Sequence, residues 1–340
     1  MSSQRIASIE LGRVIAILAI TALHCQLFLT YFLIDDTPWV GYLFNQATRF
    51  AVPLFFLISG YLIAEKLSQS PVRTLYRYVK PLFRIWLIWS VICLLMPFNL
   101  EVVVQQGYLA ERSGYWNYLW QTPFNSLLEG GLVHLWFLPA LAIAMTIIAI
   151  MKRLSLGGWI VPVAILLYGY GVLAGSYQPL TEWPAPFFTR NGPFFATLMV
   201  SIGVAIRVHQ FKLSSYLALA LAAIGMALHL VEAFWLTGYG QPFNVHDFLF
   251  ATPLWATGVF LWLLSQPTLG DNRWIHAWSP RVLAIYVSHL PMAIVMMNVA
   301  GFLQLEGAGK DAVVFFGMLA LTALLIKTVE GTRLQALLFR

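Results

Sequence analysis

Three ionisable side chains interrupt the first long apolar stretch of the chain. Glu10, Arg13 and His24 lie at helical spacing, and the step from Arg13 to His24 corresponds to about 16 Å along one helix face. Such groups are costly inside a membrane unless they face a polar cavity or a partner. An imidazole can serve as a general base near neutral pH, and an arginine can hold an anion. The pattern predicts half of an active site; the structural alternatives are a hydrogen bond from His24 to a neighbouring helix and snorkelling of Arg13 beside Glu10.

A second cation, Arg49, lies ten residues into the next apolar run, counted from Trp39. One interpretation is a structural salt bridge. No acidic residue is expected at that depth in the first three helices, so an anionic or carbonyl ligand is the alternative partner. Further along this run, Pro53 is expected to kink the span, and Ser59 with Gly60 forms a small-residue patch for close helix contact.

The segment before the third span carries one basic face. Arg73, Arg77, Lys80 and Arg84 recur every three to four residues. Basic residues at this position commonly set topology or attract anionic membrane lipid. Because this row continues into the membrane at Arg84, we also expect it to hold a phosphorylated cofactor.

Two later histidines stand in apolar segments. His134 begins the fourth predicted span, and His289 lies in the ninth with Tyr286 one turn away. The structural alternatives are an interfacial histidine and a core histidine with satisfied hydrogen bonds. The two cysteines lie in apolar runs, and no ligand set has metal-site spacing, so neither a disulfide nor a metal site is expected.

The composition indicates a membrane protein. Of the 340 residues, 60% are hydrophobic and only 10% are charged, against about 25% charged in soluble chains. We therefore expect an all-α, polytopic helical bundle in which residues 1–340 form a single membrane domain, with no appended soluble domain. The net charge of +6 is explained by basic cytoplasmic loops and does not require a nucleic-acid partner.

Ten stretches are apolar and long enough to cross a bilayer. Basic residues, including Arg5 and Arg340, collect in alternate connections, which places both termini in the cytoplasm. The longest outer connection, residues 98–131, is rich in Trp and Tyr and is expected to be an interfacial cap or part of a ligand site. The last ten residues are expected to form a short interfacial helix. The predicted spans are 11–34, 40–64, 79–98, 134–151, 159–175, 192–208, 214–237, 246–265, 282–303 and 312–329.

Taken in order, these motifs resemble the acyltransferase-3 family of integral membrane O-acyltransferases over nearly the full length. Members carry an acid, an Arg and a His in the first helix, as at Glu10, Arg13 and His24. They carry V-P-L-F-F-x-I-S-G-Y-L after an Arg, as at residues 52–62 after Arg49. They also carry segments like H-L-W-F-L and I-Y-x-x-H, matched at residues 134–138 and 285–289. The most similar type is the bacterial O-acetyltransferase of surface glycans, as for enterobacterial common antigen.

Two departures from the family pattern bear on the site. The usual L-R-G around the first Arg is Gly12, Arg13 and Val14 here. The R-x-x-R of the third helix is Arg77 followed by Lys80, which keeps the charge but loses the bidentate fork.

The resemblance implies acyl-CoA, most simply acetyl-CoA, as a donor substrate and not a permanent cofactor. It implies a glycan or lipid-linked saccharide as acceptor and the bacterial inner membrane as location. His24 would be the general base; direct transfer and an acetyl-histidine intermediate are both open. Arg49 would stabilise the oxyanion or position the acceptor. The expected cofactor-binding residues are Arg13, Arg77, Lys80 and Arg84, and the supporting residues are Glu10, Ser59, His134, Trp136, Tyr286 and His289.

Two other classes of protein fit a ten-helix membrane chain. One is a transporter or flippase, and the other is a non-catalytic membrane subunit of glycan assembly. The sequence has no inverted repeat and few carboxylates in the middle of its spans, which disfavours a transporter. No particular oligomeric state is indicated.

Overall fold

The computed structural model describes residues 6–339, so Arg5 and Arg340, used in the topology prediction, lie outside the described residues. Within that range the chain is helical, and an isolated bridge between Ile34 and Thr37 is its one strand-like feature. The all-α class is therefore confirmed.

Among the described residues, ten helical segments correspond one to one with the ten predicted spans. Seven are long and apolar enough to cross a membrane: Ala7–His24, Trp39–Gln69, Pro71–Leu95, Val133–Arg153, Ser215–Thr237, Arg273–Phe302 and Gly307–Val329. Three shorter apolar segments complete the set: Gly157–Leu173, Pro193–Val208 and Thr252–Ser265. The chain is a polytopic membrane protein.

The described chain divides into two compact units. The first contains residues 6–19, 46–80 and 140–282, and the second contains residues 20–45, 81–139 and 283–339. Five helices of the described chain contain residues of both units: α1 (Ala7–His24), α2 (Trp39–Ala47), α4 (Pro71–Leu95), α8 (Phe137–Arg153) and α15 (Val282–Phe302).

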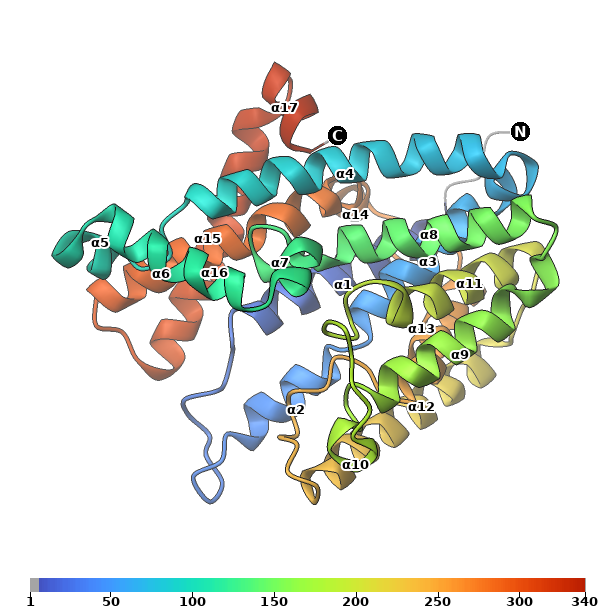
Figure 1. Ribbon diagram of the computed structural model, residues 1–340, viewed down its shortest axis with the longest axis horizontal. Coiled ribbons are helices and arrows are strands. Elements are labelled where there is room, and N and C mark those ends of the chain that lie inside the picture. Colours follow the sequence, from blue (N-terminus) through green and yellow to red (C-terminus); the bar gives the residue numbers. More distant parts are fainter. Residues whose placement is uncertain (1–5, 340) are drawn as a thin grey trace. The chain divides into compact units, whose positions relative to one another are not determined.

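In the first unit, α11 packs against α3 and α9, and α13 packs against α12 and α3 (Figure 1). Close contact depends on glycine, as predicted for the patch at Gly60. A side chain at Gly60 would collide with the backbone of Val200, and one at Gly225 would collide with that of Trp255. Helices of this unit are α3 (Ala51–Gln69), α9 (Ile160–Leu173), α10 (Gln178–Thr181), α11 (Pro193–Val208), α12 (Ser215–Thr237), α13 (Thr252–Ser265) and α14 (Arg273–Trp278), with 3-10 turns η2 (Gly157–Trp159) and η3 (Ser279–Arg281).

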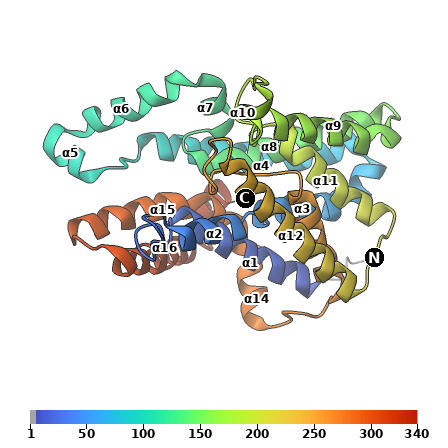
Figure 2. The same cartoon turned by 90° about the horizontal axis from the view of Figure 1, so that it is seen from below.

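In the second unit, α15 and α16 run side by side (Figure 2), with Gly317 of α16 against the side chain of Met296. The expected terminal helix is present as α17, whose Leu338 carbonyl accepts a hydrogen bond from the Trp89 indole at 2.8 Å. Helices of this unit are α5 (Leu100–Gln106), α6 (Tyr108–Gln121), α7 (Pro123–Glu129), α16 (Gly307–Val329) and α17 (Arg333–Leu338), with the 3-10 turn η1 (Val133–Trp136).

The first span ends earlier than predicted. Helix α1 stops at His24, so His24 occupies its last turn and not the middle of a helix reaching residue 34. The backbone then turns left-handed at Gln26 and Phe28, which no helix accommodates. Asp311 stabilises this path, because its Oδ2 accepts the Phe28 N–H at 2.7 Å and the Tyr31 hydroxyl at 3.1 Å. A tertiary contact, invisible in local sequence, thus stabilises the chain path that follows the end of the helix.

The second span is broken and not kinked at Pro53 as predicted. Helix α2 ends at Ala47 and α3 begins at Ala51, with Arg49 in the turn between them. Pro53 occupies the first turn of α3, where it needs no N–H partner but prevents the helix from continuing backwards through residue 49. The interruption gives Arg49 freedom to leave the helical path.

Candidate active site

Two predicted histidines meet in the second unit. Nδ1 of His24, in the last turn of α1, lies 2.7 Å from Nε2 of His289 on α15. The ring centroids are 5.0 Å apart and the ring planes differ by 11°. With the nitrogens this close, those values describe two rings lying edge to edge in nearly one plane. This is the geometry of an N–H···N hydrogen bond and not of face-to-face stacking.

The backbone fixes the tautomers of this pair. Nδ1 of His289 lies 2.6 Å from the Tyr286 carbonyl oxygen, which can only accept, so His289 carries its proton on Nδ1. Nε2 of neutral His289 is then an acceptor, and His24 must donate to it from Nδ1. The remaining ring nitrogen of neutral His24, Nε2, therefore bears the lone pair. A base must present such a lone pair to its substrate.

His134 and Tyr286 surround His289. His134 lies in η1, is buried, and donates from Nε2 to the Val287 carbonyl at 3.0 Å. The Tyr286 hydroxyl donates to the His134 carbonyl. The ring centroids of His134 and His289 are 5.2 Å apart at a near-perpendicular angle of 84°. The structure thus brings these predicted supporting residues around His289, while Trp136, half-buried, ends the same 3-10 turn.

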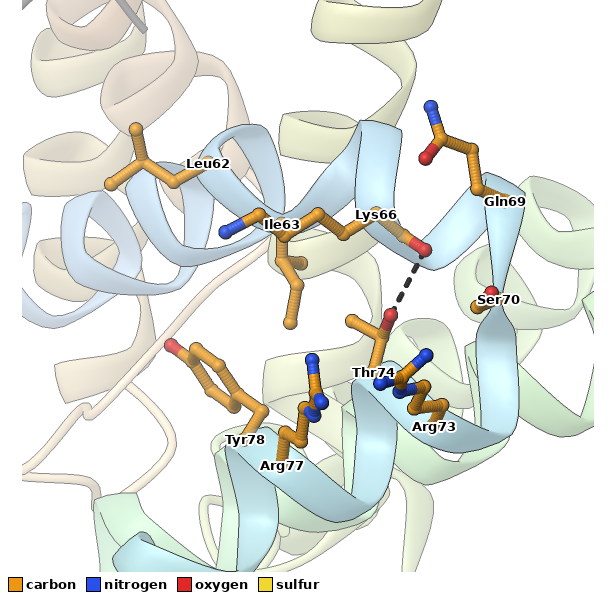
Figure 3. Close-up of a pocket in the computed structure, with 9 residues that line it drawn as sticks. All are labelled: Leu62, Ile63, Lys66, Gln69, Ser70, Arg73, Thr74, Arg77 and Tyr78. Carbon is orange, nitrogen blue, oxygen red and sulfur yellow. Dashed lines mark hydrogen bonds between the residues drawn. The ribbon is translucent and has the colours of Figure 1, made fainter. Parts of the chain in front are cut away.

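A cationic cavity lies in the first unit, where the start of α4 folds back along the end of α3 (Figure 3). Its volume is about 590 Å³. Three cations line it, Lys66, Arg73 and Arg77, and Tyr78 points from α4 toward α3. Thr74 fastens the two helices by donating its hydroxyl to the Lys66 carbonyl at 2.9 Å.

The other members of the predicted basic row are placed differently. Lys80 does not line the cavity, and its Nζ lies 5.4 Å from the centroid of the Tyr76 ring, one turn earlier on α4. Arg84 is exposed and belongs to the second unit. Cofactor binding by Lys80 and Arg84 stays a prediction.

Tyr78 connects the cavity to Arg13. Its hydroxyl is hydrogen-bonded to Ser59, and it is an electrostatic neighbour of Arg13. The predicted supporting role of Ser59 thereby gains a physical contact beyond helix packing.

Glu10 has a partner that the sequence did not suggest. Its Oε2 lies 2.6 Å from Nδ1 of His276, and Nε2 of His276 lies 2.6 Å from Asp271. Because carboxylates only accept, both ring nitrogens donate and His276 is an imidazolium. Glu10 is also an electrostatic neighbour of Arg13, and its supporting role stays a prediction.

Arg49 is engaged by an acid from a distant segment. Its Nη1 lies 2.6 Å from Asp247, in the connection before α13, and its Nη2 donates to the Asn244 carbonyl at 3.2 Å. The second oxygen of Asp247 binds Arg190 at 2.8 Å. Burial alone would raise the pKa of Asp247, but Arg190 and Arg49 hold it below its ordinary value. Two arginines on one carboxylate leave a net positive charge, and a catalytic role for Arg49 stays a prediction.

Sequence reasoning did not single out Tyr78, Asp247, His276 or Asp311. A search for an acid to match Arg49 that included the later connections, and not only the first three helices, would have found Asp247. The contacts of His276 with Glu10 and of Asp311 with Phe28 gave no local signal, because each joins residues more than 250 positions apart in the chain.

Comparison with known proteins identifies the class. A family model described as an acyltransferase domain matches residues 6–327, and the chain belongs to this acyltransferase-3 family. A serine/alanine racemase of Enterococcus gallinarum is 27% identical over 263 residues, covering 71% of this chain. The chain corresponds to 35% of that relative's length, so the relative's name describes a much longer protein. No solved structure matches the chain.

Proposed function

We propose that this protein is an O-acyltransferase of the bacterial inner membrane that moves an acyl group, most simply acetyl, from acyl-CoA to a hydroxyl of a cell-surface glycan or glycolipid. Membership of the acyltransferase-3 family supports acyl transfer. The observation that carries the assignment of the base is the 2.7 Å contact between His24 and His289.

In the proposed reaction, Nε2 of His24 takes the proton of the acceptor hydroxyl as its oxygen attacks the thioester carbonyl. A C–O bond forms, the C–S bond breaks, and the imidazolium returns the proton to the departing thiolate, giving the ester and CoA. The Nδ1–H···Nε2 bond to His289 holds the ring and spreads the positive charge that develops on His24.

The donor's phosphates are proposed to bind in the cationic cavity. Phosphate oxygens accept charge-assisted hydrogen bonds from arginine and lysine, and Arg77, Arg73 and Lys66 supply such donors from two helices. Arg13 would hold a further phosphate oxygen beside Tyr78. Arg13 and His24 both belong to α1, so in this proposal one helix would take part in donor binding and in chemistry.

For the acceptor, we retain Arg49 as a positioning group. Its hydrogen bonds to Asp247 and to the Asn244 carbonyl fix the guanidinium, and the second arginine leaves the cluster positively charged. A fixed positive charge suits a developing oxyanion or a hydroxyl-rich acceptor.

The test is transfer of labelled acetyl from acetyl-CoA to glycan in membranes holding wild type, His24→Ala or His209→Ala. His209 is an exposed control outside the site. Loss of a general base should lower transfer by about 100-fold or more. Normal transfer by His24→Ala would contradict the assignment of the base. Mass spectrometry of surface glycan from a deletion strain distinguishes an acyltransferase from the other two classes of membrane protein. Loss of acetyl from an intact polymer supports the enzyme, and loss of the polymer indicates a flippase or assembly subunit.

A further inference from the structure

A second hollow lies in the second unit, where α5 begins and α15 ends. We call it the α5–α15 pocket; its volume is about 540 Å³, within the range of small-molecule sites. The lining residues include no lysine or arginine. Those that carry the argument are Phe98, Asn99, Glu101, Asn298, Phe302 and Gln304.

Several contacts hold Phe98, a lining residue of the α5–α15 pocket, in place. The Phe98 N–H donates to Glu111 at 2.9 Å, and its carbonyl accepts from Asn298 Nδ2 at 2.9 Å. The guanidinium of the fully buried Arg112 lies 4.3 Å from the centroid of the Phe98 ring. The Tyr115 ring packs edge-on against the Phe98 ring, with the two ring centroids 4.6 Å apart. Contacts of this kind hold a recognition surface in place before a ligand arrives.

Some polar side-chain atoms of the pocket's lining residues make no hydrogen bond within the described protein. Asn99 uses its Oδ1 to cap α5 at Val102 N, and Glu101 accepts from Gln105 through Oε1. Within residues 6–339, no protein group bonds to Asn99 Nδ2, to Glu101 Oε2 or to the side-chain amide of Gln304. One donor, one anionic acceptor and one amide of the lining residues are therefore available to a ligand, and two phenylalanines line the same pocket.

We propose that the α5–α15 pocket binds a neutral saccharide unit of the acceptor; this rests on the glycan acyl transfer proposed above. Amides and a carboxylate bind sugar hydroxyls, while Phe98 and the 61%-exposed Phe302 offer apolar faces to the C–H side of a sugar ring. Glu101 and the lack of lining cations disfavour a phosphate or other anion. The positive-inside rule assigns this end of α15 to the outer side, where surface glycans are exposed.

The pocket is a subsite and not the reacting centre. Asn298 follows His289 by nine residues on α15, which is about 14 Å along the helix axis and half a turn around it. A unit bound there would be remote from the modified hydroxyl. Binding energy from such remote units holds a polymer in place while another unit reacts.

The first test does not need catalysis. Phe302→p-benzoylphenylalanine, irradiated in membranes that contain surface glycan, should give adducts carrying hexose or hexosamine masses by mass spectrometry. The matched control is the same replacement at Phe316, which is 66% exposed on α16. Saccharide adducts at 302 and not at 316 support the pocket; lipid adducts alone, or saccharide equally at both sites, overturn it.

The second test is kinetic. We expect two variants, Glu101→Gln and Asn99→Asp, each to raise KM for the glycan about fivefold, while KM for acyl-CoA stays within about twofold. Asn99→Asp keeps the side-chain oxygen that caps α5. Gln106→Ala on α5 is the control. Unchanged KM for the glycan in both variants would overturn the pocket with acyl transfer intact. A wild-type protein that transfers no acyl group would instead overturn the proposed function, and saccharide adducts at residue 302 would still support the pocket.

Discussion

Nδ1 of His24 lies 2.7 Å from Nε2 of His289, and a carbonyl oxygen on the far side of His289 determines which nitrogen of each ring holds the proton. In the proposed reaction His289 would act on His24 as a carboxylate does on a catalytic histidine, by fixing tautomer and orientation. Unlike a carboxylate, neutral His289 carries no negative charge, so it would stabilise the imidazolium form of His24 less and would favour return of the proton to the departing thiolate of the proposed donor.

The first prediction follows from this orienting role. His289→Ala removes the acceptor for the His24 Nδ1 proton, and we expect kcat to fall by about 10- to 100-fold, the loss typical of an orienting partner. His289→Gln offers a carbonyl oxygen to the same proton and should recover part of the rate. The measurement is single-turnover acyl transfer across pH 5–9, because a change in the basicity of His24 also moves the acidic limb of the profile.

A double variant separates positioning from direct chemistry. If His289 acts through His24, adding His289→Ala to His24→Ala should cause almost no further loss. Independent, additive losses would mean that His289 has its own contact with substrate. A His289→Gln profile identical in rate and pH dependence to that of the alanine variant would argue for a purely structural role.

Much of the fold could be predicted, because bilayer thickness demands about 20 apolar residues per span, and the described chain has seven helices that meet this length and three shorter apolar ones. The site was only partly predictable. His24 and His289 were each suspected as ionisable groups in apolar segments, yet nothing local pairs residues 265 positions apart. The end of α1 at His24 was missed because Asp311, and not a local helix breaker, stabilises the turn after it.

The second prediction concerns the cationic cavity. Arg77→Ala and Arg73→Ala should each raise KM for acyl-CoA about tenfold with little change in kcat, the effect of one charge-assisted hydrogen bond. Lys212→Ala, an exposed cation outside the cavity, is the control. Repeating the series with a donor that lacks the 3′-phosphate tests the contact directly. A residue that binds that phosphate should show a much smaller effect with the truncated donor, and an undiminished effect would exclude the contact.

The third prediction concerns Asp247, which holds Arg49 and Arg190 together. Asp247→Asn leaves two neighbouring cations without their shared carboxylate, and we expect a loss of stability on the order of 2 kcal/mol. Because the pKa of Asp247 is lowered in the folded protein, its contribution is present above the unfolded pKa and is lost as pH falls through the folded value. Thermal unfolding in detergent should separate wild type from variant at pH 7, and the difference should begin to shrink only as pH falls below about 4. A difference independent of pH would contradict this linkage.

The fourth prediction concerns the segment that follows His24. Asp311 accepts both the Phe28 N–H and the Tyr31 hydroxyl through one oxygen, so Asp311→Ala leaves the left-handed turn without its clamp. We expect faster hydrogen exchange across residues 25–38 and a fall in kcat of about tenfold, with KM for acyl-CoA unchanged, since the cavity proposed for the donor lies in the first unit and Asp311 in the second. Asp311→Asn retains an acceptor oxygen and should behave closer to wild type. Exchange that is unchanged in Asp311→Ala would show that other contacts hold the segment, and a rise in KM for acyl-CoA in place of the fall in kcat would assign Asp311 to donor binding.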